Sequence, residues 1–532
     1  MAASGGPRLT DEQRRAITAR GVSVALSAGA GCGKTFVLTE RFLAQLDPKL
    51  GLASARWSPG RRAAARDGPF ALNELVAITF TERAAREMRD RVRGACRQRL
   101  LDAPDEEVDY WLDLLRQLDS ARISTIHSFC GTLLRAHAVE AGLDPRFHVL
   151  DESQAETVLY EIIDDELRTR LIARDEAVTE LVVAFGLESL RAMVGDLLGG
   201  RLDIDWNAWQ NVGPGDLVAR WQTYHRERVV PSALARLSRS DAFQTVLRLA
   251  RECVPASATM RERCRALSQR MPNLPESEDA AGDLRAIVEH ARVQGGGGKS
   301  AWPDEATYEA FRDASGKLRE SVKQALVYFE FDPDAAVPAA EAGLRLLSVA
   351  RSVDDAYRAE KRELAALDFD DLMIHAKRLL TAPEQAGLRE RLASGIRLLL
   401  VDEFQDTDPL QVELVEALCG EMLTRGKLFF VGDFKQSIYR FRGADPHVFR
   451  RLQETTPPDG RLPLTRNFRS QPAILRFVNA LFCDDLGPGY EALTPHRLQV
   501  TREPAVELLW APDEFPEQRT GQADRLRRRE AD

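Results

Sequence analysis

The sequence predicts an α/β protein with a parallel central sheet and a large all-helical insertion. Three observations support this fold class. An apolar run at 22–27 leads through a glycine-rich loop into a helical pattern, a fully apolar run at 398–401 ends in two carboxylates, and helical patterns fill residues 150–362 between them. Strands that are apolar on both faces are typical of parallel sheets covered by helices on both sides.

The glycine-rich loop has the residues of a phosphate-binding loop. Its small side chains allow backbone N–H groups to approach phosphate oxygens. Lys34 is placed to neutralise the β- and γ-phosphates of ATP, and Thr35 to offer a hydroxyl to Mg²⁺. An ordinary glycine-rich turn is the alternative interpretation, because an alanine replaces the first glycine of the usual pattern. The loop comprises Ala28, Gly29, Ala30, Gly31, Cys32, Gly33, Lys34 and Thr35.

A second string of this kind, four glycines followed by Lys299 and Ser300, provides a comparison. No apolar strand precedes it, and Trp302-Pro303 ends any helix after it. This second string is therefore interpreted as a flexible linker.

Composition limits the classes of protein that fit. The net charge is −9, so any nucleic-acid surface must be local. Seven scattered cysteines without Cys-x-x-Cys spacing, and only eight histidines, argue against zinc or iron–sulfur sites and favour a reducing, cytoplasmic compartment. No apolar run approaches the roughly 20 residues that span a bilayer, so no membrane partner is expected. A length of 532 residues allows about three or four domains.

A basic segment follows the apolar run 75–80. A solvated helix face is one explanation for its arginines. However, Thr79 and Phe80 end the predicted strand, where open α/β sheets present ligands. An aromatic ring beside arginines also suits base stacking next to a phosphate track. The arginines are Arg83, Arg86, Arg89, Arg91, Arg93, Arg97 and Arg99.

The apolar run at 398–401 ends in Asp402 and Glu403. Paired with a phosphate loop, Asp402 can hold the Mg²⁺ shell and Glu403 can orient or deprotonate the attacking water. Acids that merely open the next loop are the alternative. A third predicted strand, at 427–433, leads into Gln436, Tyr439 and further aromatics and arginines, which suit a γ-phosphate sensor beside a base-stacking surface.

The order of these motifs resembles superfamily 1A helicases of the UvrD/Rep class. Seven or more blocks stand in the family's order between about residues 9 and 470. They are LTDEQ at 9–13, AGAGCGKT at 28–35, AITFTERAA at 77–85, ISTIHSFC at 123–130, LDFDDL at 367–372, VDEFQDTD at 401–408, QSIY at 436–439 and LTRNFRS at 464–470.

The resemblance implies further roles. Gln13 would read adenine and Phe468 would stack on it, while Gln436 would contact the γ-phosphate. Arg469 would reach the same phosphate as an arginine finger. With Glu403, these complete an ATP- and Mg²⁺-dependent active site. The implied single-strand DNA track comprises Thr79, Phe80, Arg83, His127, Tyr439, Phe441 and Arg442, with a structural histidine as the alternative for position 127.

Departures from the plain UvrD pattern favour the AddA/RecB branch, the helicase subunits of helicase–nuclease complexes. Phe36 stands where arginine usually follows the phosphate loop, and Lys435 and Phe441 occupy an acidic and a tryptophan position. The resemblance implies 3′→5′ movement in double-strand break repair, with single-stranded and duplex-end DNA and a second helicase–nuclease subunit as partners.

The resemblance also implies the domain organisation. We expect the first part of a RecA-like ATPase domain (1A) at 1–150, a helical insertion (1B) at 151–362, the second part of 1A at 363–455, and the start of a second RecA-like lobe (2A) at 456–532. The insertion could contact DNA or serve only as a scaffold. The family's later motifs are absent after residue 470, and one further strand is expected at 506–510. The alternative function is therefore a truncated module that binds ATP and single-stranded DNA without unwinding.

Overall fold

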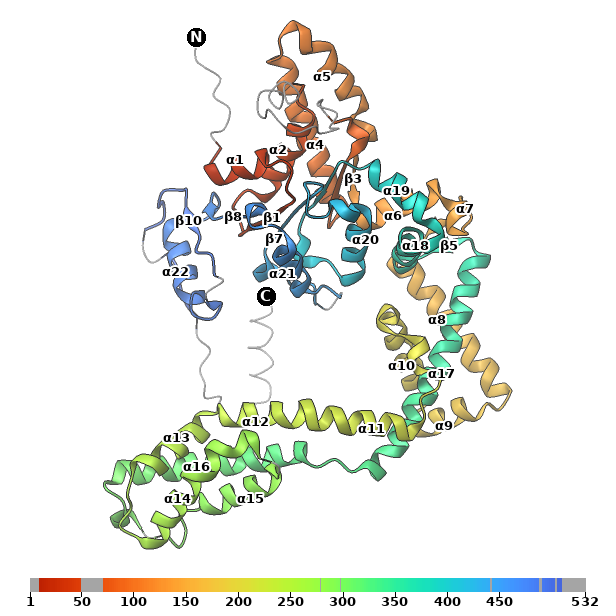
Figure 1. The fold of residues 1–532 in the computed structure, drawn as a ribbon. Coiled ribbons are helices and arrows are strands. Elements are labelled where there is room, and N and C mark those ends of the chain that lie inside the picture. Colours follow the sequence, from red (N-terminus) through yellow and green to blue (C-terminus); the bar gives the residue numbers. More distant parts are fainter. Residues whose placement is uncertain are drawn as a thin grey trace. The chain divides into compact units, whose positions relative to one another are not determined.

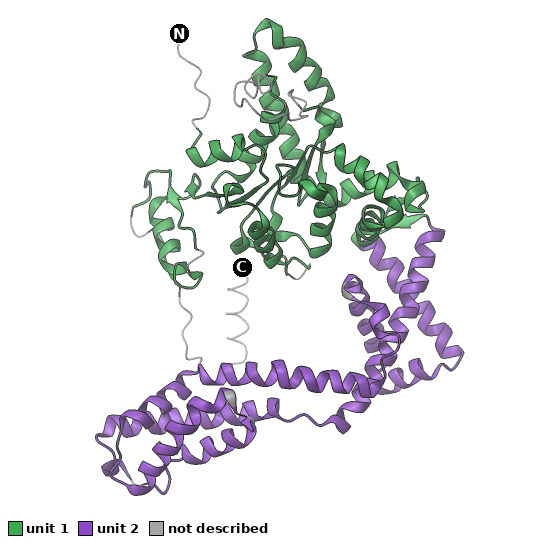
Figure 2. Ribbon diagram, in the orientation of Figure 1, with its two compact units in different colours: residues 1–152, 365–532 green, residues 153–364 purple. Residues whose placement is uncertain are grey.

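The computed structural model forms two compact units (Figures 1 and 2). Unit 1 consists of Met1–Glu152 and Ala365–Asp532, and unit 2 is the continuous segment Ser153–Leu364. The structure describes residues 9–48, 70–277, 279–296, 298–440, 443–487, 490–502 and 505–509. No helix in these ranges is both long and apolar enough to cross a membrane.

A parallel sheet forms the centre of unit 1, which confirms the expected fold class (Figure 1). The strands are fully buried where the sequence is apolar throughout, and the runs expected as strands from 22, 75, 398 and 427 are confirmed. In spatial order the six described strands are β3 (Arg122–Thr125), β2 (Leu75–Thr79), β6 (Leu398–Val401), β7 (Leu428–Gly432), β1 (Val24–Ala28) and β8 (Arg461–Leu464).

Helices cover both faces of this sheet, which explains why its central strands carry apolar side chains on both sides. Alternate residues of β1 belong to two different apolar cores, with Ala25 in one and Val24 and Leu26 in the other. The second core contains α1 (Asp11–Thr18), α2 (Lys34–Gln45), α4 (Glu82–Leu101) and α5 (Asp105–Gln117). The first contains α6 (Ile126–Ala136), α18 (Phe369–Thr381), α19 (Ala386–Ser394), α20 (Pro409–Cys419) and α21 (Pro446–Thr455).

The outer strand β8 comes from residues that the sequence analysis assigns to a second lobe. It pairs with β1, with Leu462 opposite Leu26, so the boundary expected after residue 455 falls before the last strand of this sheet. Beyond it lie β9 (Arg466–Asn467), α22 (Pro472–Phe482) and β10 (Thr494–Pro495). The strand expected at 506–510 is not formed by residues 505–509, where Leu509 is 96% exposed and has no strand to pair with. Trp510 lies outside the described residues.

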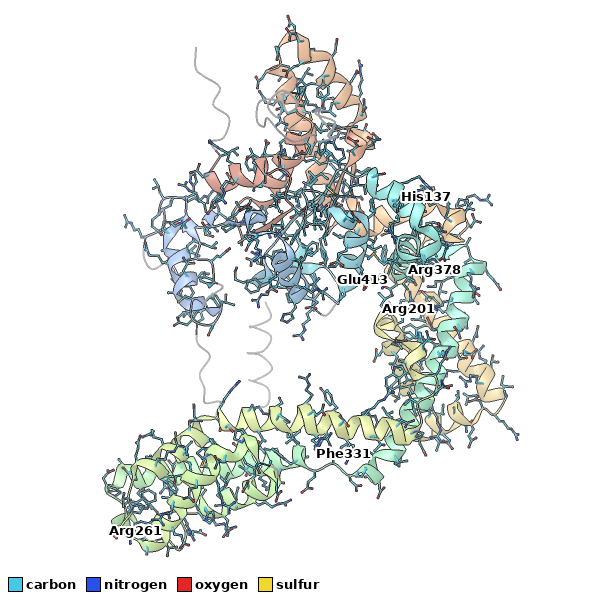
Figure 3. All side chains as sticks on the ribbon, viewed as in Figure 1. His137, Arg201, Arg261, Phe331, Arg378 and Glu413 are labelled. Carbon is cyan, nitrogen blue, oxygen red and sulfur yellow. The ribbon has the colours of Figure 1, made fainter. Side chains whose placement is uncertain are left out.

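Unit 2 is helical throughout its described residues and has apolar cores made only of its own side chains. Polar contacts secure its loops: Arg261 donates hydrogen bonds to the carbonyls of Pro255 and Ala256, and the ring of Phe331 lies beside His225 (Figure 3). Its α-helices are α8 (Glu152–Ile172), α9 (Glu176–Phe185), α10 (Leu187–Gly199), α11 (Pro214–Tyr224), α12 (Val230–Ser238), α13 (Asp241–Glu252), α14 (Ala258–Asn273), α15 (Ala280–His290), α16 (Glu305–Leu326) and α17 (Pro333–Glu363).

One loop expected in this unit is wrong. The stretch 271–275 continues α14 through Pro272 and ends in a 3₁₀ turn, because Met271 and Leu274 are both buried in the surrounding core. The second glycine string behaves differently from the phosphate loop: Lys299 forms ion pairs with Glu305 and Glu309.

Two short strands join the units' chain segments. β4 (His148–Val149) precedes unit 2, β5 (Ala366–Leu367) follows it, and the two pair in parallel within unit 1. The helix α7 (Ala138–Ala141) lies just before β4 in the chain. Both ends of the helical segment are thereby held at one place.

Candidate nucleotide and nucleic-acid sites

The phosphate loop lies at the carboxyl end of β1 and opens into α2. Gly31 and Gly33 have φ angles of +75° and +86°, which glycine adopts without steric cost. Gly33 is the N-cap of α2, and Lys34 is the first helical residue. Backbone N–H groups of the loop and the first turn are thus gathered at a helix N-terminus, an arrangement that favours bound phosphate.

Lys34 forms a close ion pair with Glu403, which directly follows β6 and Asp402 in the chain. Its Nζ lies 2.6 Å from Glu403 Oε2, and the lysine side chain is only 11% exposed. Burial and the charge of Glu403 raise the pKa of the adjacent Asp402 to about 6, while Lys34 opposes the rise. Glu403 has a φ of +49°, a strained backbone conformation for a residue other than glycine.

The residues around Thr35 fit a Mg²⁺ ion that accompanies a nucleotide. Asp402 supplies one buried carboxylate, 8% exposed, and Thr35 lies in the first turn of α2. Within the described residues, no group of three or more His, Cys, Asp or Glu side chains could hold a metal. Mg²⁺ is commonly held by one or two protein ligands together with phosphates and waters, so a small donor set is the appropriate one.

Gln13 lies against the phosphate loop. Its amide is fixed by a capping box at the start of α1, where Oε1 accepts from the Thr10 backbone N–H at 3.1 Å. A Cβ on Gly33 would lie 3.3 Å from Gln13 Nε2. Glu12 accepts two hydrogen bonds from Thr465, from N at 3.0 Å and from Oγ1 at 2.8 Å, which ties α1 to the segment that carries Phe468.

Residues 467–469 contact the phosphate loop directly. Asn467 Nδ2 donates to the Ala30 carbonyl at 2.6 Å, and the Phe468 backbone N–H donates to the Gly31 carbonyl at 2.8 Å. A Cβ on Gly31 would lie 2.6 Å from Arg469 Cβ. The structure therefore brings Phe468 and Arg469 to the loop, although the Phe468 ring lies against His496, with centroids 4.7 Å apart.

The sequence analysis missed a second segment at the loop. Leu493 Cδ2 lies 2.6 Å from where a Cβ on Gly29 would be, and Ser27 Oγ donates to Glu491 Oε2 at 3.1 Å. Asn479 holds this segment, because its Nδ2 donates to the Leu493 carbonyl and its Oδ1 accepts from the Leu493 N–H. No motif in the sequence marks these residues, so only the fold reveals them.

Gln436 points towards the end of β7. Its Nε2 donates to Asp433 Oδ2 at 2.7 Å, and Lys435 Nζ lies 2.9 Å from the other oxygen of the same carboxylate. Asp433 is 2% exposed, so this carboxylate is fixed in place beside the nucleotide site.

Phe80 and Tyr439 form an aromatic pair at the ends of β2 and of the segment after β7. Their ring centroids are 4.8 Å apart with an interplanar angle of 34°. Both are partly exposed, which suits base stacking. Arg83 is exposed nearby in the chain and pairs with Glu87 at 3.0 Å. Phe441 and Arg442 lie outside the described residues.

His127 and Phe369 form a second ring contact, with centroids 5.1 Å apart. Burial lowers the pKa of His127, which favours the neutral imidazole at neutral pH. Phe369 is 42% exposed and was not singled out from the sequence, although an aromatic directly after a short strand is a usable signal. Thr79 differs from its expected role: it is 3% exposed and its hydroxyl donates to the Thr81 carbonyl.

Glu82 links the two elements that carry these rings. Its Oε1 accepts from Ser128 Oγ at 2.6 Å and from Thr125 Oγ1 at 2.8 Å. The hydrogen bond from Ser128 is the main cause that holds the pKa of Glu82 below its ordinary value, and Thr125 acts in the same direction. The N-terminus of α4 is thereby tied to β3 and α6.

Comparison with known proteins agrees with this geometry. A family model described as the UvrD/REP helicase N-terminal domain matches residues 9–457. ATP-dependent helicase/nuclease subunits of one and the same name from Moorella thermoacetica and Desulforudis audaxviator are each 29% identical, over 92% and 97% of this chain. The protein of that name from Ligilactobacillus salivarius is 27% identical over 90% of the chain. The matched part covers only 36%, 44% and 39% of these relatives, respectively.

Proposed function

The chain belongs to the UvrD/REP helicase family, and on that premise we propose that it is the ATP-dependent motor part of a DNA helicase of the AddA type, the helicase-bearing component of a helicase–nuclease. The observation that carries this proposal is the ion pair between Lys34 and Glu403 beside the buried Asp402. A cation, an acid and a metal-binding carboxylate from distant parts of the chain meet there at a phosphate loop.

The ion pair suggests how the site engages its substrate. A bound Mg·ATP supplies the phosphate charge and the bond to be cleaved. Lys34 then exchanges Glu403 for phosphate oxygens, and Glu403 is released to orient or deprotonate water. Gln436 and Arg469 act from either side on the terminal phosphate, while Gln13 and Phe468 hold adenine.

The proposed DNA track is built on the pair of Phe80 and Tyr439, extended by His127 and by the arginines at 83 and 442. Stacking on an aromatic ring tolerates any base, which a motor requires. We further propose 3′→5′ movement on single strands, action at duplex ends during double-strand break repair in the cytoplasm, and assembly with a second protein chain. The names of the relatives support an assembly that contains a nuclease.

ATP turnover by the purified chain, with and without a single-stranded oligonucleotide, tests the nucleotide site. Lys34→Ala should lower turnover by about 10²–10³-fold, because it removes the cation that stabilises phosphate charge. Lys299→Ala is the matched control, since it removes a lysine from the glycine string in unit 2. Unchanged turnover in Lys34→Ala contradicts the assignment. Binding of ATP and DNA by the unaltered chain without turnover would instead support the alternative of a binding module.

The direction of movement has its own measurement. A 3′→5′ motor displaces streptavidin from a 5′-biotinylated oligonucleotide in the presence of ATP and leaves a 3′-biotin complex intact. The opposite pattern contradicts the proposed direction while leaving the nucleotide site unaffected.

A further inference from the structure

Gln405 is a buried amide that lies between the nucleotide site and the segment leading to the aromatic pair. It is 2% exposed. Its Nε2 donates to Glu403 Oε2 at 2.9 Å and to Asp406 Oδ2 at 3.1 Å, and its Oε1 accepts from the Asp433 backbone N–H at 3.0 Å. Because both sides of the amide are engaged, the orientation of the side chain is defined by three partners.

The end of β7 is shaped to admit this side chain. A Cβ on Gly432 would lie 2.8 Å from Gln405 Oε1 and 2.9 Å from the Phe449 ring, so any larger residue would displace the amide. The backbone of Gly432 is not in the left-handed region. Space for Gln405, rather than backbone conformation, therefore accounts for the glycine.

From Gln405, hydrogen bonds continue towards the aromatic pair. Asp433, whose backbone N–H donates to Gln405, in turn accepts from Gln436 Nε2 at 2.7 Å. Burial and the charge of Glu403 raise the pKa of Asp406, and hydrogen bonds from Gln405 and from the Ile438 backbone N–H oppose the rise. Ile438 directly precedes the tyrosine of the pair. Two short routes thus connect Glu403 with the segment 436–439.

We propose that Gln405 is a positioning residue that couples nucleotide binding at Glu403 to DNA binding at the aromatic pair. The proposal rests on the proposed function. When Glu403 leaves Lys34, its carboxylate no longer holds Gln405 Nε2 in the same place. The amide must then adjust its bonds to Asp406 and Asp433, and each of these carries one route to the segment 436–439. Coupling of this kind requires a contiguous element that both sites bias.

Binding linkage tests the proposal without requiring turnover. Fluorescence anisotropy gives the Kd of a labelled oligothymidine with and without a saturating, non-hydrolysable Mg·ATP analogue. In the unaltered chain the two Kd values should differ about 5-fold or more. Gln405→Met should bring their ratio to about 1 while each ligand still binds within about twofold of its original affinity. A purely structural role would weaken both affinities or lower the melting temperature without changing the ratio.

Two further variants sharpen the test. Gln405→Glu keeps an acceptor for the Asp433 N–H but loses both donors, so it should also abolish the linkage. Gln411→Met, at the start of α20, is the matched control and should retain it. Full linkage in either Gln405 variant, or a ratio of 1 in the unaltered chain when both ligands bind, overturns the proposal alone. Absence of analogue binding by the unaltered chain, or analogue binding that Lys34→Ala leaves unchanged, overturns the proposed function and the proposal with it.

Discussion

At the residue scale, Phe80 makes the most direct prediction about DNA binding. Because its ring lies 4.8 Å from Tyr439 and is partly exposed, removing it removes a stacking surface. Phe80→Ala should weaken binding of a single-stranded oligonucleotide by about 1–3 kcal/mol, measured by anisotropy. Phe80→Leu, which retains apolar volume without a π face, should lose nearly as much. Unchanged affinity in both variants would assign the ring to packing alone.

Glu403 separates binding from chemistry. Glu403→Gln keeps the shape of the side chain, so nucleotide affinity should stay close to that of the unaltered chain. A lost general base should lower kcat by about 10²–10⁴-fold. Steady-state turnover with KM determined for each variant measures the two effects separately, and an equal loss in both parameters would contradict the assigned role.

The sequence predicted residues whose roles depend on motif chemistry and strand order. Lys34 and Glu403 are 369 positions apart, yet parallel strands place their ends together, so their meeting was expected. Asn467, Gln405 and Leu493 were not assigned roles, because their contacts depend on side-chain orientation and on loops without a fixed period. Thr79 was expected to face DNA, but the alternation of side chains along β2 turns it inwards.

At the scale of elements, Glu82 makes the junction of α4 with β3 and α6 sensitive to acid. Its folded-state pKa lies below the unfolded value of about 4.3, so it contributes stability above that value and loses it as the pH falls through the folded pKa. Urea unfolding between pH 3 and 6 should show a shallower pH dependence for Glu82→Gln than for the unaltered chain. Glu87→Gln, which removes an exposed acid from the same helix, is the control.

Two glycines of unit 1 have opposite predictions. Gly31 has a φ of +75° and its Cβ would lie 2.6 Å from Arg469 Cβ, so Gly31→Ala should destabilise unit 1 by at least about 1 kcal/mol. Gly94 lies inside α4 with no atom within 4 Å of its Cβ position, so Gly94→Ala should stabilise it by about 0.5–1 kcal/mol. Denaturant midpoints measure both changes, and the same sign for the two variants would contradict this account of the loop.

Elements were predictable where one periodicity dominated over many residues. The four strands expected from apolar runs are present, since burial on both faces leaves little ambiguity about them. Local signals failed where packing overrode them. Pro272 indicated a break, but the buried neighbours Met271 and Leu274 hold the helix and the turn after it. The run at 506–510 indicated a strand, but residues 505–509 have no neighbour with which to pair.

At the scale of the whole molecule, separate cores predict separate unfolding. The apolar clusters of unit 1 contain no residue of unit 2, and the reverse also holds. Differential scanning calorimetry should therefore resolve two transitions. Gly316→Ala, at an open position inside α16, should raise only the transition of unit 2, and Gly94→Ala only that of unit 1. A single transition that both variants shift would contradict independent cores.

The pairing of β4 with β5 has a kinetic consequence. Neighbouring strands β2 and β6 are far apart in the chain, pairing Leu75 with Leu398, and bringing them together incurs the closure entropy of a very long loop. Once residues 153–364 have folded, most of that loop is no longer a random coil. Early collapse of the helical segment should then speed formation of the sheet, so mutations that slow its folding should delay the appearance of ATP binding during refolding, even though they lie far from Lys34 in the sequence.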